Sequence, residues 1–460
     1  MKFSLHKTIK LIFIGTLILA MLAGCSSASS TSTATPASTQ AAVSQTTAAA
    51  AAGSGTPAGS APGGAPGGGS TTIDTGTGAY VLSANETLSG GTYTSTKADE
   101  NAIRAKGDIT AALKNVTVEK SGDTSSNDSS SFYGLNAAIL ALDTTTLNIN
   151  GGTVTATAEG ANGVFAYDGA TINITDTVIK VSGGNAGGIE VAGGGKMNAT
   201  NLTVNSTVKA AIRSDRGSGT LIVDGGTYTT SGNSGAPAVY STANITVSNA
   251  TLTANDSEAV VVEGLNSVIL KNCVVTGNMT GTYGKSSGEN IHNVMLYQSM
   301  SGDAATGTSN FTMTDGSLTS KNGDMFYVTN THSIATLSGV KLTLADGTNL
   351  LTVAGNDASR GWGTAGSNGG NITFNLSAQT ATGNIAVDSI STLALNIAKS
   401  SSYTGAINSD GTQASSLSVT IDSTSTWTLS ADSYITSFSG SMDNVVANGH
   451  KLYVNKAAVN

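Results

Sequence analysis

A short apolar element recurs along this chain at nearly constant spacing, and this repeat limits the chain to a small set of folds. The element is a small residue, then a β-branched residue, then a variable residue. Its central residues are Ile103, Ile139, Val164, Ile189, Ile212, Val239 and Val260. From Ile139 onward they are 25, 25, 23, 27 and 21 residues apart. One such unit cannot bury its apolar face alone, so we expect the repeats to stack as a solenoid.

Two further elements lie between successive copies of the first. One is an apolar-polar-apolar triplet or close to it: Leu147-Asn148-Ile149, Ile172-Asn173-Ile174, Leu221-Ile222-Val223, Ile245-Thr246-Val247 and Val268-Ile269-Leu270. The other follows Gly or Asn turn residues, as in Gly151-Gly152-Thr153-Val154-Thr155 and Gly225-Gly226-Thr227-Tyr228-Thr229. Alternation with a period of two residues is typical of β-strands. The sequence therefore predicts three short strands in each repeat.

Three short strands in about two dozen residues indicate one coil of a parallel β-helix, in which each coil pairs with the next at about 4.8 Å. The pattern loosens but continues toward the C-terminus, so we predict an all-β domain over residues 73–460 with about thirteen coils. The intervals 121–133 and 281–290 are longer than the other gaps between strand elements and are expected to form loops that project from the rod.

The N-terminal segment has the layout of an export signal. Lys2, Lys7 and Lys10 precede an uncharged apolar run at residues 11–21, which is too short for a permanent membrane span. The run ends in Leu22-Ala23-Gly24-Cys25, which resembles the lipobox of bacterial lipoproteins. The resemblance implies a signal peptide over residues 1–24, cleavage between Gly24 and Cys25, and lipidation of Cys25. An ordinary secretory signal with a chance cysteine is the alternative.

Residues 25–72 are predicted to be a disordered linker between the lipid and the β-helix. After Cys25 the segment consists mainly of Ser, Thr, Ala, Gly and Pro and has no Asp, Glu, Lys or Arg. It has nothing to bury, and its root-mean-square reach is roughly 35 to 40 Å for a flexible chain. We therefore expect an extracytoplasmic protein, lipid-anchored to the cell membrane or outer membrane and held away from it at the cell surface.

Charge and cysteine content restrict the partners. Loss of the three signal-peptide lysines leaves 18 basic against 29 acidic residues, a formal net charge of −11. An acidic surface disfavours nucleic acid. Lipidation of Cys25 would leave Cys273 as the one other cysteine of the sequence. We expect Cys273 to be a small buried hydrophobic residue and predict no internal disulfide.

The repeat style resembles the right-handed β-helix surface proteins often described as adhesin-like. Residues 427–438 and 448–454 are similar to the last coils of autotransporter passenger domains, which implies capping coils from about residue 415 that close the solenoid. The sequence departs from that family because no translocator barrel follows Asn460. The lipid at Cys25 is then expected to supply the anchor, and autotransport is not implied.

One group of residues is a candidate catalytic site, because β-helices also include pectate-lyase-like and polygalacturonase-like enzymes. Alignment of the repeats places Glu190 and Arg213 at equivalent positions on consecutive coils, with Asp168, Asp215 and Arg216 nearby. A lyase would hold calcium or substrate with the carboxylates and remove a proton with Arg213. The alternative is a cross-strand ion pair of little consequence.

Other chemistries are less well supported. His292, His332 and His450 lie far apart in an array where coils contact only neighbours, and Gly193-Gly194-Gly195-Lys196 lacks the pattern of a phosphate loop. We therefore expect no metal and no cofactor. Thr-X-Thr pairs such as Thr153-Val154-Thr155 suggest ice binding as a remote alternative, but we expect Ile179 and Val275 to interrupt the threonine column.

The leading interpretation is a monomeric, adhesin-like surface lipoprotein whose β-helix binds glycan or another envelope or host surface. A rigid solenoid presents an extended surface suited to repetitive ligands. The candidate ligand-binding side chains are tyrosines expected to be exposed and able to stack on sugar rings: Tyr167, Tyr240, Tyr283 and Tyr327. Packing between coils is the other interpretation of each. A polysaccharide lyase or hydrolase and a purely structural spacer are the rival functions.

Overall fold

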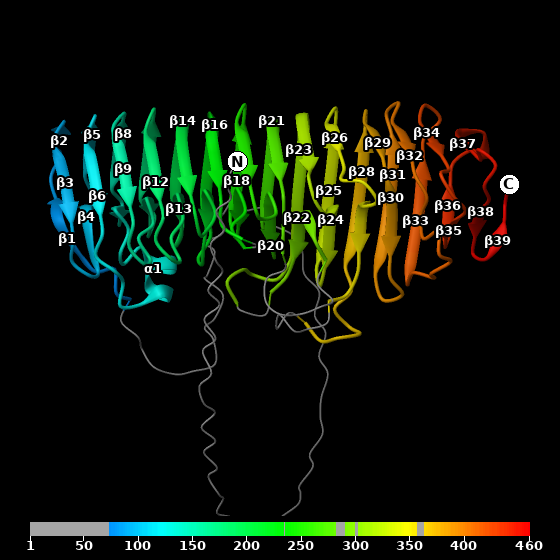
Figure 1. The fold of residues 1–460 in the computed structure, drawn as a ribbon, viewed down its shortest axis with the longest axis horizontal. Coiled ribbons are helices and arrows are strands. Elements are labelled where there is room, and N and C mark those ends of the chain that lie inside the picture. Colours follow the sequence, from blue (N-terminus) through cyan, green and yellow to red (C-terminus); the bar gives the residue numbers. More distant parts are fainter. Residues whose placement is uncertain (1–72, 234, 282–289, 300–301, 357–362) are drawn as a thin grey trace, which may run out of the picture. The chain divides into compact units, whose positions relative to one another are not determined.

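The described part of the chain is a stack of parallel β-coils (Figure 1). The computed structural model describes residues 73–460 except residues 234, 282–289, 300–301 and 357–362. Sheet A contains twelve strands, and a further bridge from Ile385 to Ile407 continues it by one coil. The prediction of about thirteen stacked coils is therefore confirmed. The predicted signal peptide, Cys25 and the predicted linker lie outside the described residues.

Sheet A is formed by the first strand of each coil. Its members are β1 (Thr77–Leu82), β4 (Glu100–Lys106), β7 (Ile139–Leu142), β10 (Val164–Ala166), β13 (Ile189–Val191), β15 (Ile212–Ser214), β17 (Val239–Ser241), β20 (Val260–Glu263), β22 (His292–Tyr297), β24 (Asp324–Thr329), β27 (Asn349–Val353) and β30 (Asn384–Val387). All the strand pairs of sheet A are parallel.

Sheet B contains the second strands and most of the third strands. Its members are β2 (Thr87–Ser89), β3 (Thr92–Ser95), β5 (Thr110–Lys114), β6 (Thr117–Lys120), β8 (Thr146–Asn150), β9 (Thr153–Ala156), β11 (Thr171–Thr175), β12 (Val178–Val181), β14 (Gly195–Ser206), β16 (Gly219–Thr230), β18 (Asn244–Ser248), β19 (Thr251–Ala254), β21 (Ser267–Gly277), β23 (Thr308–Ser320), β25 (His332–Ser338), β26 (Lys341–Thr343), β28 (Asn371–Ser377), β31 (Thr392–Ala398), β33 (Ser416–Ile421) and β36 (Ser437–Ser439). In β14, β16, β21 and β23 the second and third strands are continuous.

The corner between the second and third strands depends on residues that tolerate a left-handed backbone. In successive coils this corner is Asn115, Gly151, Asp176, Asn201, Gly225, Asn249, Asn272, Asp315 and Gly339, all with φ near +60°. Asn and Asp adopt this conformation more readily than other residues with a side chain, and Gly does so without steric cost. Corner amides also bond between coils, since Asn201 donates to Asp176 at 2.6 Å and Asn272 to Asn249 at 3.0 Å.

The core is built from the repeated apolar elements, which stack in columns. One unbroken column on sheet A contains Ile103, Ile139, Val164, Ile189, Ile212, Val239, Val260, Val294, Phe326, Leu351, Ile385 and Ile407. Each is at most 1% exposed. The repeated residues thus identified the core correctly. Cys273 is buried in this core as a free thiol.

The third strands correct one detail of the threonine column. Ile179 and Val275 are fully buried in the core and do not belong to the outward column. The residues that interrupt it are their neighbours Val178 and Val274, which pair with Thr153 and Thr251 of adjacent coils. The prediction was wrong by one position in each strand, and one position is enough to move a side chain to the opposite face of the strand.

The longest connections flank sheet A, whereas the corner between the second and third strands stays short. Segments 121–138, 278–291, 298–307 and 354–370 all lead into or out of sheet A. The first was predicted to be a loop but contains α1 (Asn127–Tyr133), the only α-helix among the described residues. Ser126 caps α1 by accepting from Ser129 N–H, and Gly134 ends it in a left-handed conformation.

The C-terminal coils continue the stack and end in an antiparallel pair. Sheet C consists of β29 (Thr380–Thr382), β32 (Ser402–Thr404), β34 (Thr426–Thr428) and β37 (Val445–Val446). Beyond it, β35 (Ser433–Ile435) pairs in parallel with β38 (Leu452–Val454), and β38 pairs antiparallel with β39 (Ala457–Ala458). Trp427 is fully buried and donates its indole N–H to the carbonyl of Gly405 at 3.0 Å.

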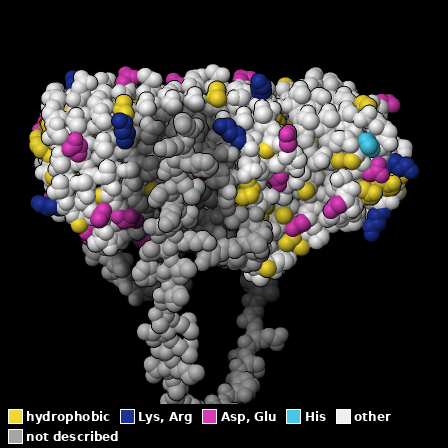
Figure 2. Space-filling view, in the orientation of Figure 1, with side chains coloured by type: hydrophobic (Ala, Val, Ile, Leu, Met, Phe, Trp, Pro, Cys, Tyr) yellow, Lys and Arg dark blue, Asp and Glu magenta, His cyan; other side chains and the backbone are white. Residues whose placement is uncertain are grey.

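The visible surface is sparsely charged. Figure 2 shows single acidic and basic side chains scattered among side chains of other types. Among the described residues, no helix has both the length and the apolar character that a membrane span requires.

Candidate ligand-binding site

The outward-facing column of sheet A contains the candidate site. Its members, in strand order, are Arg104, Leu140, Phe165, Glu190, Arg213, Tyr240, Val261, Met295, Tyr327, Thr352 and Ala386. Most of these side chains are buried although they point away from the solenoid core. Two apolar clusters form on this face, one around Phe165 and one around Met295, and a charged group lies between them.

The charged group contains the predicted catalytic candidates. Glu190 and Arg213 are register partners on β13 and β15, as the repeat alignment predicted. A carboxylate oxygen of Glu190 lies 3.6 Å from Arg213 Nε, and Asp215 accepts from Arg213 Nη2 at 2.5 Å. Glu190 is fully buried, and neither of its oxygens accepts a hydrogen bond from any residue that the structure describes. The pair is thus not an exposed surface ion pair.

Burial and proximity control the charges of this group. Burial raises the pKa of Glu190 to about 8 and the pKa of Asp215 to about 6, although Arg213 partly offsets both shifts. Burial opposes the charge on Arg213, but Glu190 and Asp215 outweigh it and raise the pKa of its guanidinium. A guanidinium held this firmly in its charged form is poorly suited to remove a proton, which weakens the lyase hypothesis.

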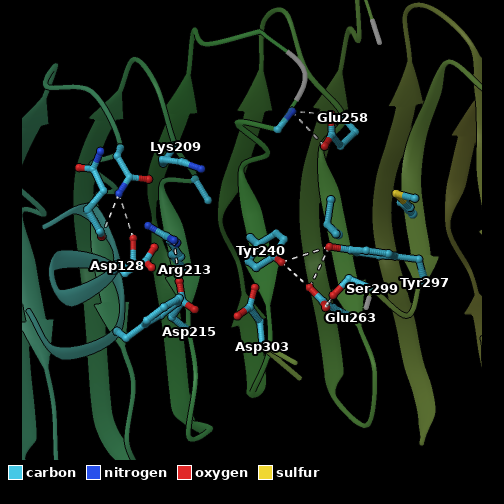
Figure 3. A pocket seen from close by; sticks show the side chains of 18 residues that line it. Asp128, Lys209, Arg213, Asp215, Tyr240, Glu258, Glu263, Tyr297, Ser299 and Asp303 are labelled. Atoms are coloured by element: carbon cyan, nitrogen blue, oxygen red, sulfur yellow. Dashed lines mark hydrogen bonds and ion pairs between the residues drawn. The ribbon is translucent and has the colours of Figure 1, made fainter. Parts of the chain in front are cut away.

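A pocket of about 420 Å³ adjoins this charged group on the outer face of sheet A (Figure 3). Helix α1 contributes part of its lining, and sheet A supplies residues from β15 to β22. The rest comes from connections that lead into or out of the strands of sheet A, including the one after β22. The lining residues are Asn127, Asp128, Ser131, Phe132, Asn185, Lys209, Ala210, Arg213, Asp215, Gly235, Tyr240, Glu258, Val261, Glu263, Met295, Tyr297, Ser299 and Asp303. Glu190 is not among them.

A carboxylate held by hydroxyl groups forms another part of the pocket. Glu263 accepts hydrogen bonds from Tyr240 at 2.5 Å, from Tyr297 at 2.8 Å and from Ser299. Figure 3 shows Tyr240, Tyr297 and Glu263 converging from neighbouring coils. Burial and the charge of Glu263 raise the pKa of both tyrosines, so their hydroxyls remain donors.

Arg216 and Asp168 were also predicted to lie near Glu190, but only Arg216 lies at the pocket. Arg216 contacts the pocket wall, because its Nε lies 2.5 Å from Asp303 and its guanidinium lies 3.9 Å from the ring centre of Phe132. Asp168 is exposed in a left-handed turn and does not line the pocket. The structure thus brings Arg213, Asp215 and Arg216 together at the pocket and leaves Asp168 outside.

The expectation of exposed tyrosines is wrong for two of the four residues. Tyr167 is 9% exposed and packs against Tyr133 of α1, with ring centres 5.6 Å apart. Tyr327 is 4% exposed and packs on the ring of His292. Tyr167 thus lies under the connection that contains α1, whose position the repeat pattern does not reveal. Tyr240 is half-buried in the pocket, and Tyr283 lies outside the described residues.

The sequence reasoning missed several lining residues. Glu263 stands at the position equivalent to Asp215, because Arg213 aligns with Tyr240 and Tyr240 with Val261. That alignment could have revealed Glu263. Lys209, Glu258 and Asp303 lie on connections, and no repeat predicts where those side chains point.

A second pocket of about 390 Å³ lies farther along sheet A, over β27 and β30. Its polar groups are largely engaged with one another, as Asn408 bonds the backbone of Val387 in both directions. Within the described residues, no three His, Cys, Asp or Glu side chains are arranged to hold a metal ion. No protein-family model, curated protein or solved structure matches the chain.

Proposed function

We propose that this protein is a lipid-anchored surface protein whose β-helix binds a glycan segment in the sheet A pocket. The observation that carries the proposal is the pocket itself, which combines carboxylates, cations, tyrosine hydroxyls and an apolar patch on rigid strands. Its volume lies in the range typical of small-ligand sites. The lipobox-like segment ending at Cys25 supports the anchor.

The chemistry of the lining suits sugars. Sugars present many hydroxyls and weakly apolar ring faces, so their sites need polar groups beside aromatic or apolar ones. Tyr240 and Tyr297 provide amphipathic rings, and Val261 and Met295 provide an apolar surface. The strands are paired on both sides, so little order must be gained on binding.

A glycoside hydrolase is the second candidate, favoured by one observation. Asp215 and Glu263 occupy equivalent positions two strands apart, hence roughly 10 Å between backbones from the strand spacing. Inverting hydrolases use two carboxyl groups at a comparable separation, and one of them has a raised pKa, as Asp215 does. Both carboxylates, however, already contact Arg213 or the tyrosines, which favours binding over catalysis.

The first test places a large side chain at the pocket mouth. Asp128 is an exposed residue of α1 that lines the pocket, so Asp128→Trp should obstruct it without disturbing the core. We expect the full-length protein to retain intact polysaccharides on a glycan array and the variant to bind at least about tenfold more weakly. Asp108→Trp is the matched control, because Asp108 is exposed and outside the pocket.

Mass spectrometry of the bound and unbound glycans separates the remaining outcomes. Shortened or unsaturated products would replace the binding function with an enzymatic one. Retention that Asp128→Trp does not reduce would place the binding surface elsewhere. Absence of any glycan retention would leave the spacer role as the better interpretation.

A further inference from the structure

We propose that Lys209 and Arg213 form an anion subsite at one end of the sheet A pocket, and that it binds the carboxylate of an acidic sugar. The inference rests on the proposed glycan-binding function and specifies the class of glycan. Both side chains line the same pocket, and Figure 3 shows them close together. Their positive charges are close enough to repel each other.

Arg213 has an unused hydrogen-bond donor at this pocket. Its Nε faces Glu190 and its Nη2 faces Asp215, so one edge of the guanidinium is engaged. In the part of the chain that the structure describes, its Nη1 has no hydrogen-bond partner, although the side chain is only 9% exposed. A buried donor without a partner costs free energy comparable to a lost hydrogen bond, which a ligand acceptor would restore.

Lys209 is a second cation without a partner. Within the described ranges its ammonium group makes no hydrogen bond and no ion pair, and the residue is half-buried at the pocket wall. Burial and the nearby charge of Arg213 lower the pKa of Lys209, although Asp215, Glu190 and Asp303 partly oppose the shift. An anion bound between the two side chains would reduce the repulsion by Arg213 and favour the charged form of Lys209.

Three of the five carboxylates that line the pocket are already held by other partners. Asp215 is engaged by Arg213 Nη2 and by the backbone N–H of Arg216 at 3.0 Å. Asp303 is paired with Arg216, and Glu263 accepts from three hydroxyls. Each of these three carboxylates thus has direct partners, whereas the ammonium of Lys209 and the Nη1 of Arg213 have none among the described residues.

A planar carboxylate fits this arrangement. A guanidinium donates to carboxylates with strong directionality, and an ammonium adds a charge that can approach from the side. A neutral hydroxyl could accept from Nη1 but would leave Lys209 uncompensated. The two cations therefore favour acidic over neutral saccharides.

The test measures binding of a matched pair of ligands by the full-length protein. One ligand is an oligosaccharide of a hexuronic acid, and the other is the same oligosaccharide with its carboxyl groups reduced to hydroxymethyl. We expect the acidic ligand to bind about tenfold more tightly, as charge-assisted hydrogen bonds predict. Lys209→Met should remove most of that preference. Lys196→Met removes the same charge from an exposed site outside the pocket and should leave the preference intact.

Each outcome has a distinct meaning. Equal binding of both ligands, or a preference unaffected by Lys209→Met in a protein of unchanged melting temperature, would overturn the anion subsite alone. Failure of both ligands to bind, together with a blank glycan array, would overturn the proposed function itself. Competition by inorganic sulfate or phosphate at lower concentration than by acetate would assign the site to a sulfated or phosphorylated group.

Discussion

Glu190 is the most unusual single residue beside the pocket, because it is a fully buried carboxyl group whose oxygens accept no hydrogen bond from the described residues. Its register partners are Phe165 on one side and Arg213 on the other. Desolvation therefore favours its protonated form, and Arg213 only partly opposes this. Removing one partner of a buried ion pair is costly when it leaves the other charge uncompensated. A protonated Glu190 is already neutral, so glutamine replaces it without a change of charge.

The pH dependence of stability should reveal this residue. A raised native pKa means that the folded protein holds a proton which the unfolded chain releases. The contribution of Glu190 is therefore complete below about pH 4.5 and is lost as the pH rises toward 8. The slope is at most about 1.4 kcal/mol per pH unit for one proton. As the pH rises from 5 to 8, the unfolding free energy of Glu190→Gln should therefore increase by roughly 3 kcal/mol relative to that of the original protein.

Urea denaturation at pH 5, 6.5 and 8 checks this expectation. Glu119→Gln is the control, since Glu119 is exposed on β6 and its replacement should leave the pH dependence unchanged. Stability curves of Glu190→Gln and the original protein that run parallel across this pH range would show that the Glu190 carboxyl does not take up a proton on folding.

At the scale of the element, the corner between the second and third strands determines how closely coils approach. A Cβ added at Gly152 would lie 2.2 Å from the carbonyl oxygen of Val116 in the preceding coil. The same close approach occurs at Gly226 and Gly316, toward Leu202 and Cys273. These glycines are needed for contact between coils as well as for their left-handed conformation.

A pair of glycine substitutions separates these two requirements. Gly152 and Gly194 have φ values of +87° and +77°, but a Cβ at Gly194 would meet nothing within 4 Å. We expect Gly194→Ala to cost about 1 kcal/mol from backbone strain. Gly152→Ala should cost about 3 kcal/mol, because it adds a clash with backbone that cannot move freely. Chemical denaturation measures both, and equal losses would mean that the coils adjust to the added carbon.

The regular elements were predictable because their side chains repeat. The column through Ile139, Val164 and Ile189 needed only alternation and spacing, and the structure confirms it. The adjacency of Glu190 and Arg213 followed from the same alignment.

The covered face of sheet A was not predictable in this way. Its cover comes partly from connections such as the one containing α1, whose only local signals were the Ser126 cap and Gly134. A repeat shows which strand residues point outward, but it does not show which connections fold over them. This is why Tyr167 and Tyr327 were expected to be exposed, and why Lys209 and Asp303 were missed.

At the scale of the whole molecule, we predict that membrane attachment and ligand binding belong to different parts of the chain. Lipidation would act at Cys25, and the charge-free segment after it would let the binding domain move relative to the membrane. The distance from membrane to ligand would then depend on linker length and not on the fold.

The two cysteines provide a direct test of the anchor. Cys25→Ser should abolish incorporation of labelled fatty acid and shift the protein from the membrane fraction to the soluble exported fraction. Cys273→Ala removes a buried thiol of the core and should leave labelling unchanged. Labelled lipid on Cys25→Ser, or an unlabelled original protein, would contradict the assignment of Cys25.

The placement of the long connections also bears on how such a protein can diversify. The short corners between the second and third strands set the spacing of successive coils. The connections that differ in length from coil to coil lead into or out of sheet A. Under the proposed function, replacing one of those segments would change what the outer face of sheet A binds, while the columns that hold the coils together would stay intact. A single inherited scaffold could in this way acquire new specificities by exchange of its connections alone, one coil at a time.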